Sequence, residues 1–285
     1  REPMPLASLS TLDADLDLLD DLVEKGLARR IDSDNYDVHD LVREFLVRSM
    51  DDSLKAELHN NAVEWYRTRT ETAVEKIEFI HHLNASGNMD MLAEVLQRDG
   101  RELVKSGHIE LLGILRGLES DGFSAIQWGL IRELRGDILS IQGRWDEAEE
   151  EYAAAIPTAK KHKEAEILAR LLSARADIAI KRGAMDDALE LHRQALEIQI
   201  AKRDAVGASR SYINMGYIFR RRKDTRHALE VYGNVEELLD AETDPSLMDA
   251  RVRLASAFLE MGELDRARDH AMAAHDGTKD NGLDA

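Results

Sequence analysis

Cysteine is absent from this 285-residue chain, which excludes disulfides, thiolate metal sites and a cysteine nucleophile. Its absence is typical of the reducing cytoplasm, where we expect the protein to reside. The apolar runs are too short to cross a bilayer and no signal-peptide pattern opens the chain, so we expect no membrane partner. Because the first residue is Arg1 and not Met, we expect the chain to be part of a longer polypeptide.

The common catalytic signatures are absent as well. The chain has no Gly-x-x-x-x-Gly-Lys-[Ser/Thr] loop for a triphosphate, no Gly-x-Ser-x-Gly elbow and no His-Glu-x-x-His zinc motif. Its acidic runs, such as residues 149–151, fit the solvated faces of helices better than paired catalytic carboxylates. We therefore predict no enzyme activity, no catalytic residue, no metal ligand and no cofactor for this chain.

Proline and aromatic residues are scarce, with four prolines and 5% aromatics, and Ala, Leu, Glu and Arg dominate. These residues are strong helix formers, so the composition predicts an all-α protein. The formal net charge of -18 repels the phosphates of nucleic acids. An acidic, Lys-poor composition is found in salt-adapted organisms, and it also fits an ordinary acidic protein; composition leaves both open.

Four six-residue cassettes recur in the second half of the chain. They are Gly-Arg-Trp-Asp-Glu-Ala at 143–148, Gly-Ala-Met-Asp-Asp-Ala at 183–188, Lys-Asp-Thr-Arg-His-Ala at 223–228 and Gly-Glu-Leu-Asp-Arg-Ala at 262–267. Their starts are 40, 40 and 39 residues apart. A fixed period of this length indicates stacked structural repeats, whose long surfaces usually bind partners.

Each cassette predicts the turn of a helical hairpin. A small residue stands seven positions before the turn (Gly136, Ala176, Gly216 and Ala255), where it lets two helices approach closely. Glycine at the turn supplies the left-handed backbone of a helix C-terminus. An aspartate three residues later suits the first turn of the next helix. Lys223 departs from this pattern, which predicts either backbone strain or a different turn there.

This pattern resembles the tetratricopeptide repeat (TPR), over roughly residues 125–280. The family's repeat has 34 residues, and the longer period here is similar to the sensor arrays of bacterial and archaeal regulators. The resemblance implies an α-α superhelix of about four TPR-like hairpins over 123–285. It also implies a groove lined by the first helix of each hairpin, which would bind a protein, a peptide or a small signal ligand.

Arginines gather at the predicted groove positions of the second and third repeats. The candidate ligand-binding residues are Arg170, Asp177, Arg210, Asn214, Tyr217, Arg220 and Arg221. Arginine suits planar recognition of carboxylate or phosphate, which favours an acidic peptide or another anionic ligand. The alternative is that these arginines pair with acidic residues of neighbouring repeats.

The first 50 residues predict a partial winged helix. Leu16, Leu19 and Val23 share one helical face, residues 27–31 and 36–38 predict two short strands around a turn, and a further helix follows over 41–46. A winged helix can bind DNA, but the first helix is crowded with aspartates, whose charge opposes phosphate contact. We expect no direct DNA binding, and a DNA-binding regulator ranks behind the two functions given below.

The segments 22–30 and 36–45 resemble the winged-helix domain of STAND-type signal-transduction NTPases, the group that includes NB-ARC proteins and the maltose-regulon activator. Val38, His39 and Asp40 match the family's motif of an apolar residue, histidine and aspartate. The resemblance implies that His39 senses the nucleotide, ADP or ATP in the full-length parent, and that Asp40 caps the following helix. It further implies a helical connector over 51–122. Otherwise His39 only ends a strand and Asp40 is only a cap.

Two functions remain in view. The first is a non-catalytic sensor region of a STAND-type NTPase or transcriptional regulator, whose partners are a ligand in the repeat groove and the parent's nucleotide-binding domain. The second is a free-standing TPR scaffold or adaptor. An upstream P-loop in the gene would distinguish the first from the second.

Overall fold

The computed structural model describes residues 4–5, 16–31, 35–38, 40–241 and 247–280. The chain divides into two compact units, Arg1–Gln127 and Trp128–Ala285. Helices dominate the described residues of both units, which confirms the all-α class that the composition predicts.

The first unit begins with a small sheet beside two helices. Strand β1 (Met4–Pro5) pairs with β3 (Asn35–Val38), and β3 pairs with β2 (Ala28–Arg30), both antiparallel. Helix α2 (Leu16–Glu24) precedes β2, and α3 (Asp40–Ser49) follows β3. The order of helix, two strands and helix matches the sequence prediction, whereas β1 was not predicted. Gly26 ends the first helix with a positive φ of 68°, as its position suggested.

The rest of this unit is a series of helices with short turns. They are α4 (Asp52–Tyr66), α5 (Ala73–Ala85), α6 (Met89–Lys105), α7 (Leu111–Arg116) and the 3₁₀ turn η2 (Ser120–Gly122). Thr72 begins α5 with a capping box to Glu75, which satisfies backbone N–H groups that a helix start leaves free. Leucines and isoleucines such as Ile80, Leu83 and Leu92 are fully buried and form the core of these helices.

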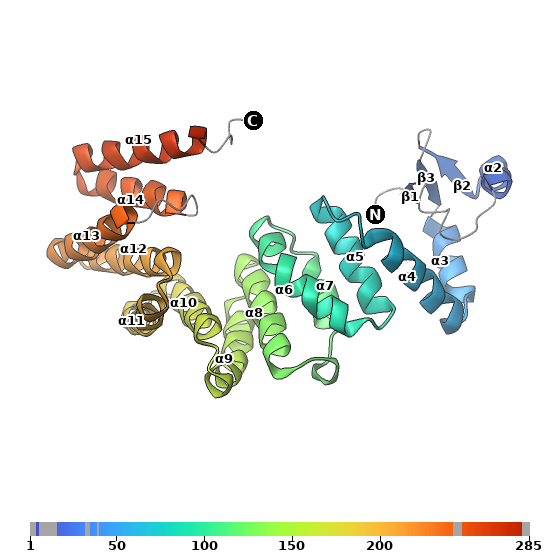
Figure 1. The fold of residues 1–285 in the computed structure, drawn as a ribbon, viewed down its shortest axis with the longest axis horizontal. Helices are drawn as coiled ribbons and strands as arrows, with labels where there is room; N and C mark the ends of the chain where they lie inside the picture. The colour runs from blue at the N-terminus through green and yellow to red at the C-terminus, as the bar shows by residue number, and fades with distance from the viewer. Residues whose placement is uncertain (1–3, 6–15, 32–34, 39, 242–246, 281–285) are drawn as a thin grey trace. The chain divides into compact units, whose positions relative to one another are not determined.

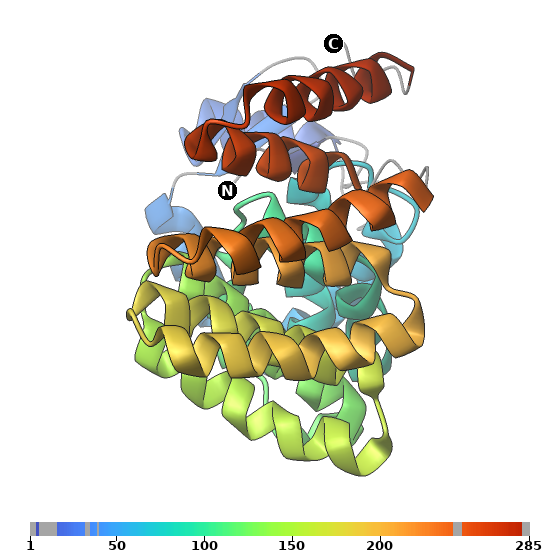
Figure 2. The same cartoon turned by 90° about the vertical axis from the view of Figure 1, so that its left-hand side faces the viewer.

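The second unit is built from helical hairpins in its described residues (Figure 1). The hairpins are α8 (Ala125–Ile141) with α9 (Trp145–His162), α10 (Ala165–Lys181) with α11 (Met185–Lys202), α12 (Ala205–Arg221) with α13 (Thr225–Ala241), and α14 (Met248–Met261) with α15 (Leu264–Asp280). Figure 2 shows these hairpins stacked one on another, with α14 and α15 at one end.

The cassettes form the predicted turns. Gly143, Gly183 and Gly262 have φ between 77° and 82°, and Lys223 has the same left-handed backbone with φ of 61°. The backbone bond from Asp224 N to Phe219 O, at 2.9 Å, matches the bond from Arg144 N to Leu139 O in the first hairpin. The third hairpin therefore uses the common turn, and Lys223 bears the strain that a side chain has in this region.

Close helix approach is confirmed at two of the four small residues, Gly136 and Gly216. A Cβ atom added to Gly136 would lie 2.4 Å from Cε1 of Tyr152, and one added to Gly216 would lie 2.2 Å from Cε1 of Tyr232. Both tyrosine rings are buried. Each glycine thus makes room for the ring that stands sixteen residues later in the partner helix.

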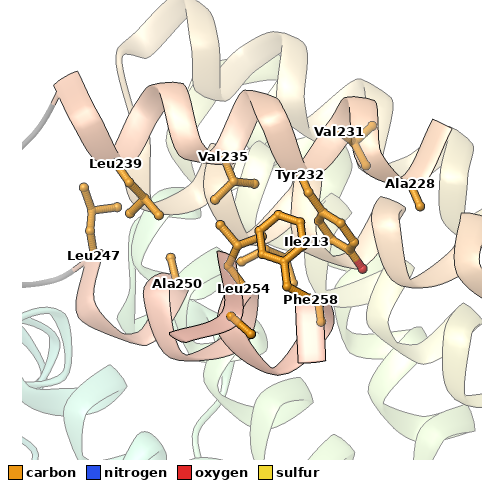
Figure 3. Close-up of a cluster of buried hydrophobic side chains, with 12 residues drawn as sticks. Ile213, Ala228, Val231, Tyr232, Val235, Leu239, Leu247, Ala250, Leu254 and Phe258 are labelled. Carbon is orange, nitrogen blue, oxygen red and sulfur yellow. The ribbon is translucent and has the colours of Figure 1, made fainter. Parts of the chain in front are cut away.

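Neighbouring hairpins share one apolar core, which explains why they stack. Figure 3 shows Ile213 of α12 and Val235 of α13 packing with Leu254 and Phe258 of α14. The ring centroids of Tyr232 and Phe258 lie 5.7 Å apart, edge to face. A single hairpin cannot bury such a face alone, so each hairpin depends on the next for stability.

Candidate functional site: the first-helix face

The first helices of the hairpins, α8, α10, α12 and α14, lie on the inner side of the curve that the second unit forms, and their partners lie outside (Figure 1). We call this inner surface the first-helix face. The predicted site residues Arg170 and Asp177 lie on α10, and the others lie on α12. At 100° per residue, Arg210, Tyr217 and Arg221 share one stripe of α12, while Arg220 points to one side of it.

Asp177 is the centre of a polar network on this face. It accepts hydrogen bonds from Nη2 of Arg210 and from Nδ2 of Asn214, the latter at 2.7 Å. The Oδ1 atom of Asn214 accepts a bond of 2.7 Å from Nη2 of Arg253 on α14. The network therefore connects the first helices of three successive hairpins.

The remaining arginines of the predicted site also have acidic or carbonyl partners. Arg170 donates from Nε to the buried Glu133 of α8 at 2.8 Å. Arg220 donates to the backbone oxygen of Ala257 at 3.1 Å and pairs with Glu260. Pairing between repeats, the alternative reading of these residues, thus holds for Arg170, Arg210 and Arg220.

All three side chains of the stripe are open to solvent. Arg221 is exposed and makes no ion pair with any residue that the structure describes. Tyr217 is 36% exposed, and the side chain of Arg210 is 54% exposed despite its bond to Asp177. The structure therefore brings Arg210, Tyr217 and Arg221 together on one accessible stripe.

His192 is the feature of this site that sequence reasoning missed. Its ring is fully buried behind Asp177, with Nε2 at 3.8 Å from Oδ1 of that residue, and neither ring nitrogen has a hydrogen-bond partner among the described residues. Burial lowers the pKa of His192 to about 4, outweighing the opposite effect of the Asp177 carboxylate. His192 is therefore neutral at pH 7.

His192 lacks a hydrogen-bond partner within the described chain because of its place in the repeat. It occupies the position that Tyr152 has in the first hairpin. The hydroxyl of Tyr152 donates to Oδ1 of Asp137 at 2.6 Å, whereas the shorter imidazole does not reach Asp177. Asp177 instead takes its partners from α12 of the next hairpin. The signal in the sequence is the histidine that stands at position 192 where the first and third repeats have Tyr152 and Tyr232.

The structure describes only part of the predicted nucleotide-sensing pair, His39 and Asp40. His39 lies outside the described residues, and Asp40 is described only as the first residue of α3. Within the described parts of the chain, no group of three or more histidine or acidic side chains is arranged to hold a metal ion. Among the helices of the same residues, none is long and apolar enough to span a membrane.

The repeats match a known family. Residues 130–201 and 167–241 match the family model of the tetratricopeptide repeat. Residues 130–241 are tetratricopeptide repeats. The α14–α15 hairpin continues the same architecture beyond the matched residues. No curated protein matches the chain in sequence.

Solved structures show a similar fold. A STAND protein with a tetratricopeptide repeat sensor from Pyrococcus horikoshii superposes with a TM-score of 0.64 at 17% identity, covering 99% of this chain and 43% of that one. The present chain thus spans less than half the length of that protein. BtubC (BKLC) from P. vanneervenii has 17% identity and covers 82% of this chain and 93% of its own, with a TM-score of 0.49. The first likeness shows a shared helical-repeat fold.

Proposed function

We propose that residues 128–285 form a non-catalytic interaction scaffold whose first-helix face binds an acidic segment of a partner protein. The observation that carries this proposal is the accessible stripe of Arg210, Tyr217 and Arg221 on α12. Arginine offers a planar set of donors that matches carboxylate geometry, and the tyrosine adds apolar contact area between the two charges.

The contacts of Arg210 support recognition of an anion. A guanidinium carries five N–H donors, and Asp177 engages Arg210 through Nη2. Holding Arg210 in one orientation lowers the entropy that a partner must overcome on binding. Arg221 adds a charge that no acidic residue in the described chain neutralises. A small anionic signal ligand would use the same donors, and it is the second candidate for this face.

Fluorescence anisotropy with two labelled twelve-residue peptides tests the proposal, one alternating Glu and Leu and the other alternating Lys and Leu. The Glu peptide should bind although the chain carries a net charge of -18, and Arg210→Glu with Arg221→Glu should weaken it at least tenfold. The matched control, Arg193→Glu with Arg226→Glu, changes the net charge equally on exposed positions of second helices, and it should bind as the wild type does. Equal losses in both double variants would show a non-specific charge effect and refute the proposal.

We further propose that this chain is the sensor region of a STAND-type NTPase that binds ADP or ATP elsewhere in the polypeptide. The fold likeness to a STAND protein over 99% of the chain and the helix–strands–helix order upstream of the repeats support it. Helix α3, which follows the predicted sensor His39, exposes Leu41 and Phe45 at 70% and 71%. An exposed apolar pair of this kind suits contact with the parent's nucleotide-binding domain.

In this scheme a partner on the first-helix face favours an open state of the parent, in which the nucleotide exchanges. The partner can shift the equilibrium only by its difference in affinity for the two states. In the full-length polypeptide, Leu41→Asp with Phe45→Asp should release a fluorescent ADP analogue at least tenfold faster. Leu54→Asp, an exposed leucine on α4, should not. A reading frame without an upstream P-loop would favour the free-standing scaffold instead.

A further inference from the structure

A cavity of about 350 Å³ lies between α9, α10 and α11. Apolar side chains of Ile178, Ala179, Ala184 and Leu191 line it, together with charged residues of all three helices. Arg175 and Ala179 lie on the opposite side of α10 from Arg170 and Asp177, because they are turned by roughly 140–180° at 100° per residue. The cavity is therefore separate from the first-helix face.

The next hairpin interface shows what would fill this space. Forty residues later, Phe219 stands at the position of Ala179, and its ring stacks on His227 with centroids 5.3 Å apart. His227 in turn occupies the position of Asp187, which lines the cavity. Ala179 thus leaves an opening where the equivalent interface holds an aromatic ring.

The walls of the two interfaces also differ, because one is apolar and the other is charged. The second interface has Leu189 and Met215 packed in its apolar core, and the first has Glu149 and Arg175 at these positions, joined by an ion pair of 2.6 Å. A charged pair at the wall keeps one side of the cavity polar and open to solvent. The cavity is therefore a consequence of four substitutions between repeats that share one backbone.

The charges at the cavity are not balanced. Arg175 is paired with Glu149, and Arg182 is paired with Asp146. Asp187 and Glu190 are exposed and make no ion pair within the described residues, although Glu190 accepts a bond from Gln194 at 2.9 Å. Two carboxylates beside an apolar opening favour an occupant with an apolar body and a positive charge.

We propose that this cavity binds a partner segment in which an aromatic residue precedes a lysine or arginine. The ring takes the place that Phe219 occupies in the next interface, and the cation lies against Asp187 and Glu190. The chain then has two recognition surfaces of opposite preference, one for an acidic segment and one for an aromatic–basic segment. This site does not depend on the function proposed for the first-helix face.

The test is a ¹⁹F NMR titration of the full chain with acetyl-(4-fluoro-Phe)-Arg-amide. Binding should broaden and shift the fluorine resonance, and acetyl-(4-fluoro-Phe)-Glu-amide should bind at least tenfold more weakly. Ala179→Phe, which installs the side chain of the next interface, should abolish binding while the circular dichroism spectrum is unchanged.

A second pair of variants tests the charges. Asp187→Asn with Glu190→Gln should weaken binding at least fivefold, whereas Asp90→Asn with Glu94→Gln, the same charge change on exposed positions of α6, should leave it unchanged. Wild-type affinity in Ala179→Phe, or equal binding of the Arg and Glu probes, would overturn the proposal. Equal affinity for free 2-phenylethylamine would overturn the assignment to a peptide segment.

Discussion

The close approach at Gly216 allows a quantitative test of the packing between paired helices. In Gly216→Ala the new Cβ would lie 2.2, 2.5 and 2.9 Å from Cε1, Cζ and Cδ1 of Tyr232. That ring is buried and backed by Phe258 (Figure 3), so it has no space into which to retreat. Overpacking of this kind costs up to ~3 kcal/mol, and alanine returns ~1 kcal/mol of helix propensity. We expect a net loss of about 2 kcal/mol in the free energy of unfolding.

Gly233→Ala is the matched control, because it is also a helical glycine but no atom lies within 4 Å of the added Cβ. It should gain about 1 kcal/mol from helix propensity alone. Urea titrations of the full chain, followed by circular dichroism, should therefore separate the two variants by about 3 kcal/mol. Adding Tyr232→His to Gly216→Ala copies the Ala176–His192 pair of the second hairpin and should recover part of the loss. A Gly216→Ala variant as stable as Gly233→Ala would refute the steric reasoning.

Two further predictions concern the turn at Lys223 and the buried imidazole. Lys223 has a left-handed backbone with φ of 61°, which costs a non-glycine residue ~1–2 kcal/mol. Lys223→Gly should therefore raise the melting temperature. An unchanged or lower melting temperature would show that Lys223 is not strained. Burial lowers the pKa of His192 to about 4, whereas the imidazole of the unfolded chain has the usual pKa of ~6.5. Between these two pH values the unfolded chain takes up the proton and the folded chain does not, so the free energy of unfolding decreases as the pH is lowered. His192→Leu should remove that loss, which amounts to about 1.6 kcal/mol between pH 6.5 and pH 5 in urea titrations. Equal losses in the wild type and in His192→Leu would show that the imidazole is not buried and neutral.

The cassettes were sufficient to predict the repeat fold, because the signals they carry are local. A glycine with positive φ, an aspartate in the first helical turn and a small residue at a helix crossing are each favoured by the backbone within a few residues. The same local logic identified the anomaly at Lys223. It predicted two strands and the flanking helices in the first unit, and it missed β1, whose pairing with β3 joins segments about thirty residues apart.

The candidate site was less accessible to sequence reasoning. The arginines of α12 could be placed on one helix by register, but their partners come from α10 and α14, so Asp177 and Glu260 could not be assigned to them in advance. The contact of Asn214 with Arg253 of α14 could not be assigned either. For this reason the sequence left two readings open, an anionic site or pairing between repeats. The structure shows pairing for Arg170, Arg210 and Arg220 and leaves Arg221 and Tyr217 accessible.

The sequence by itself determined the helical class, the period of the hairpins and the positions of their turns, because helix propensity, capping and turn chemistry act over a few residues along the chain. Only the tertiary structure decided which charges are neutralised, that His192 is buried without a partner, and that Ala179 opens a cavity where the next interface is filled. These properties depend on side chains of different helices, which lie far apart in the sequence and meet only when the helices pack and the hairpins stack.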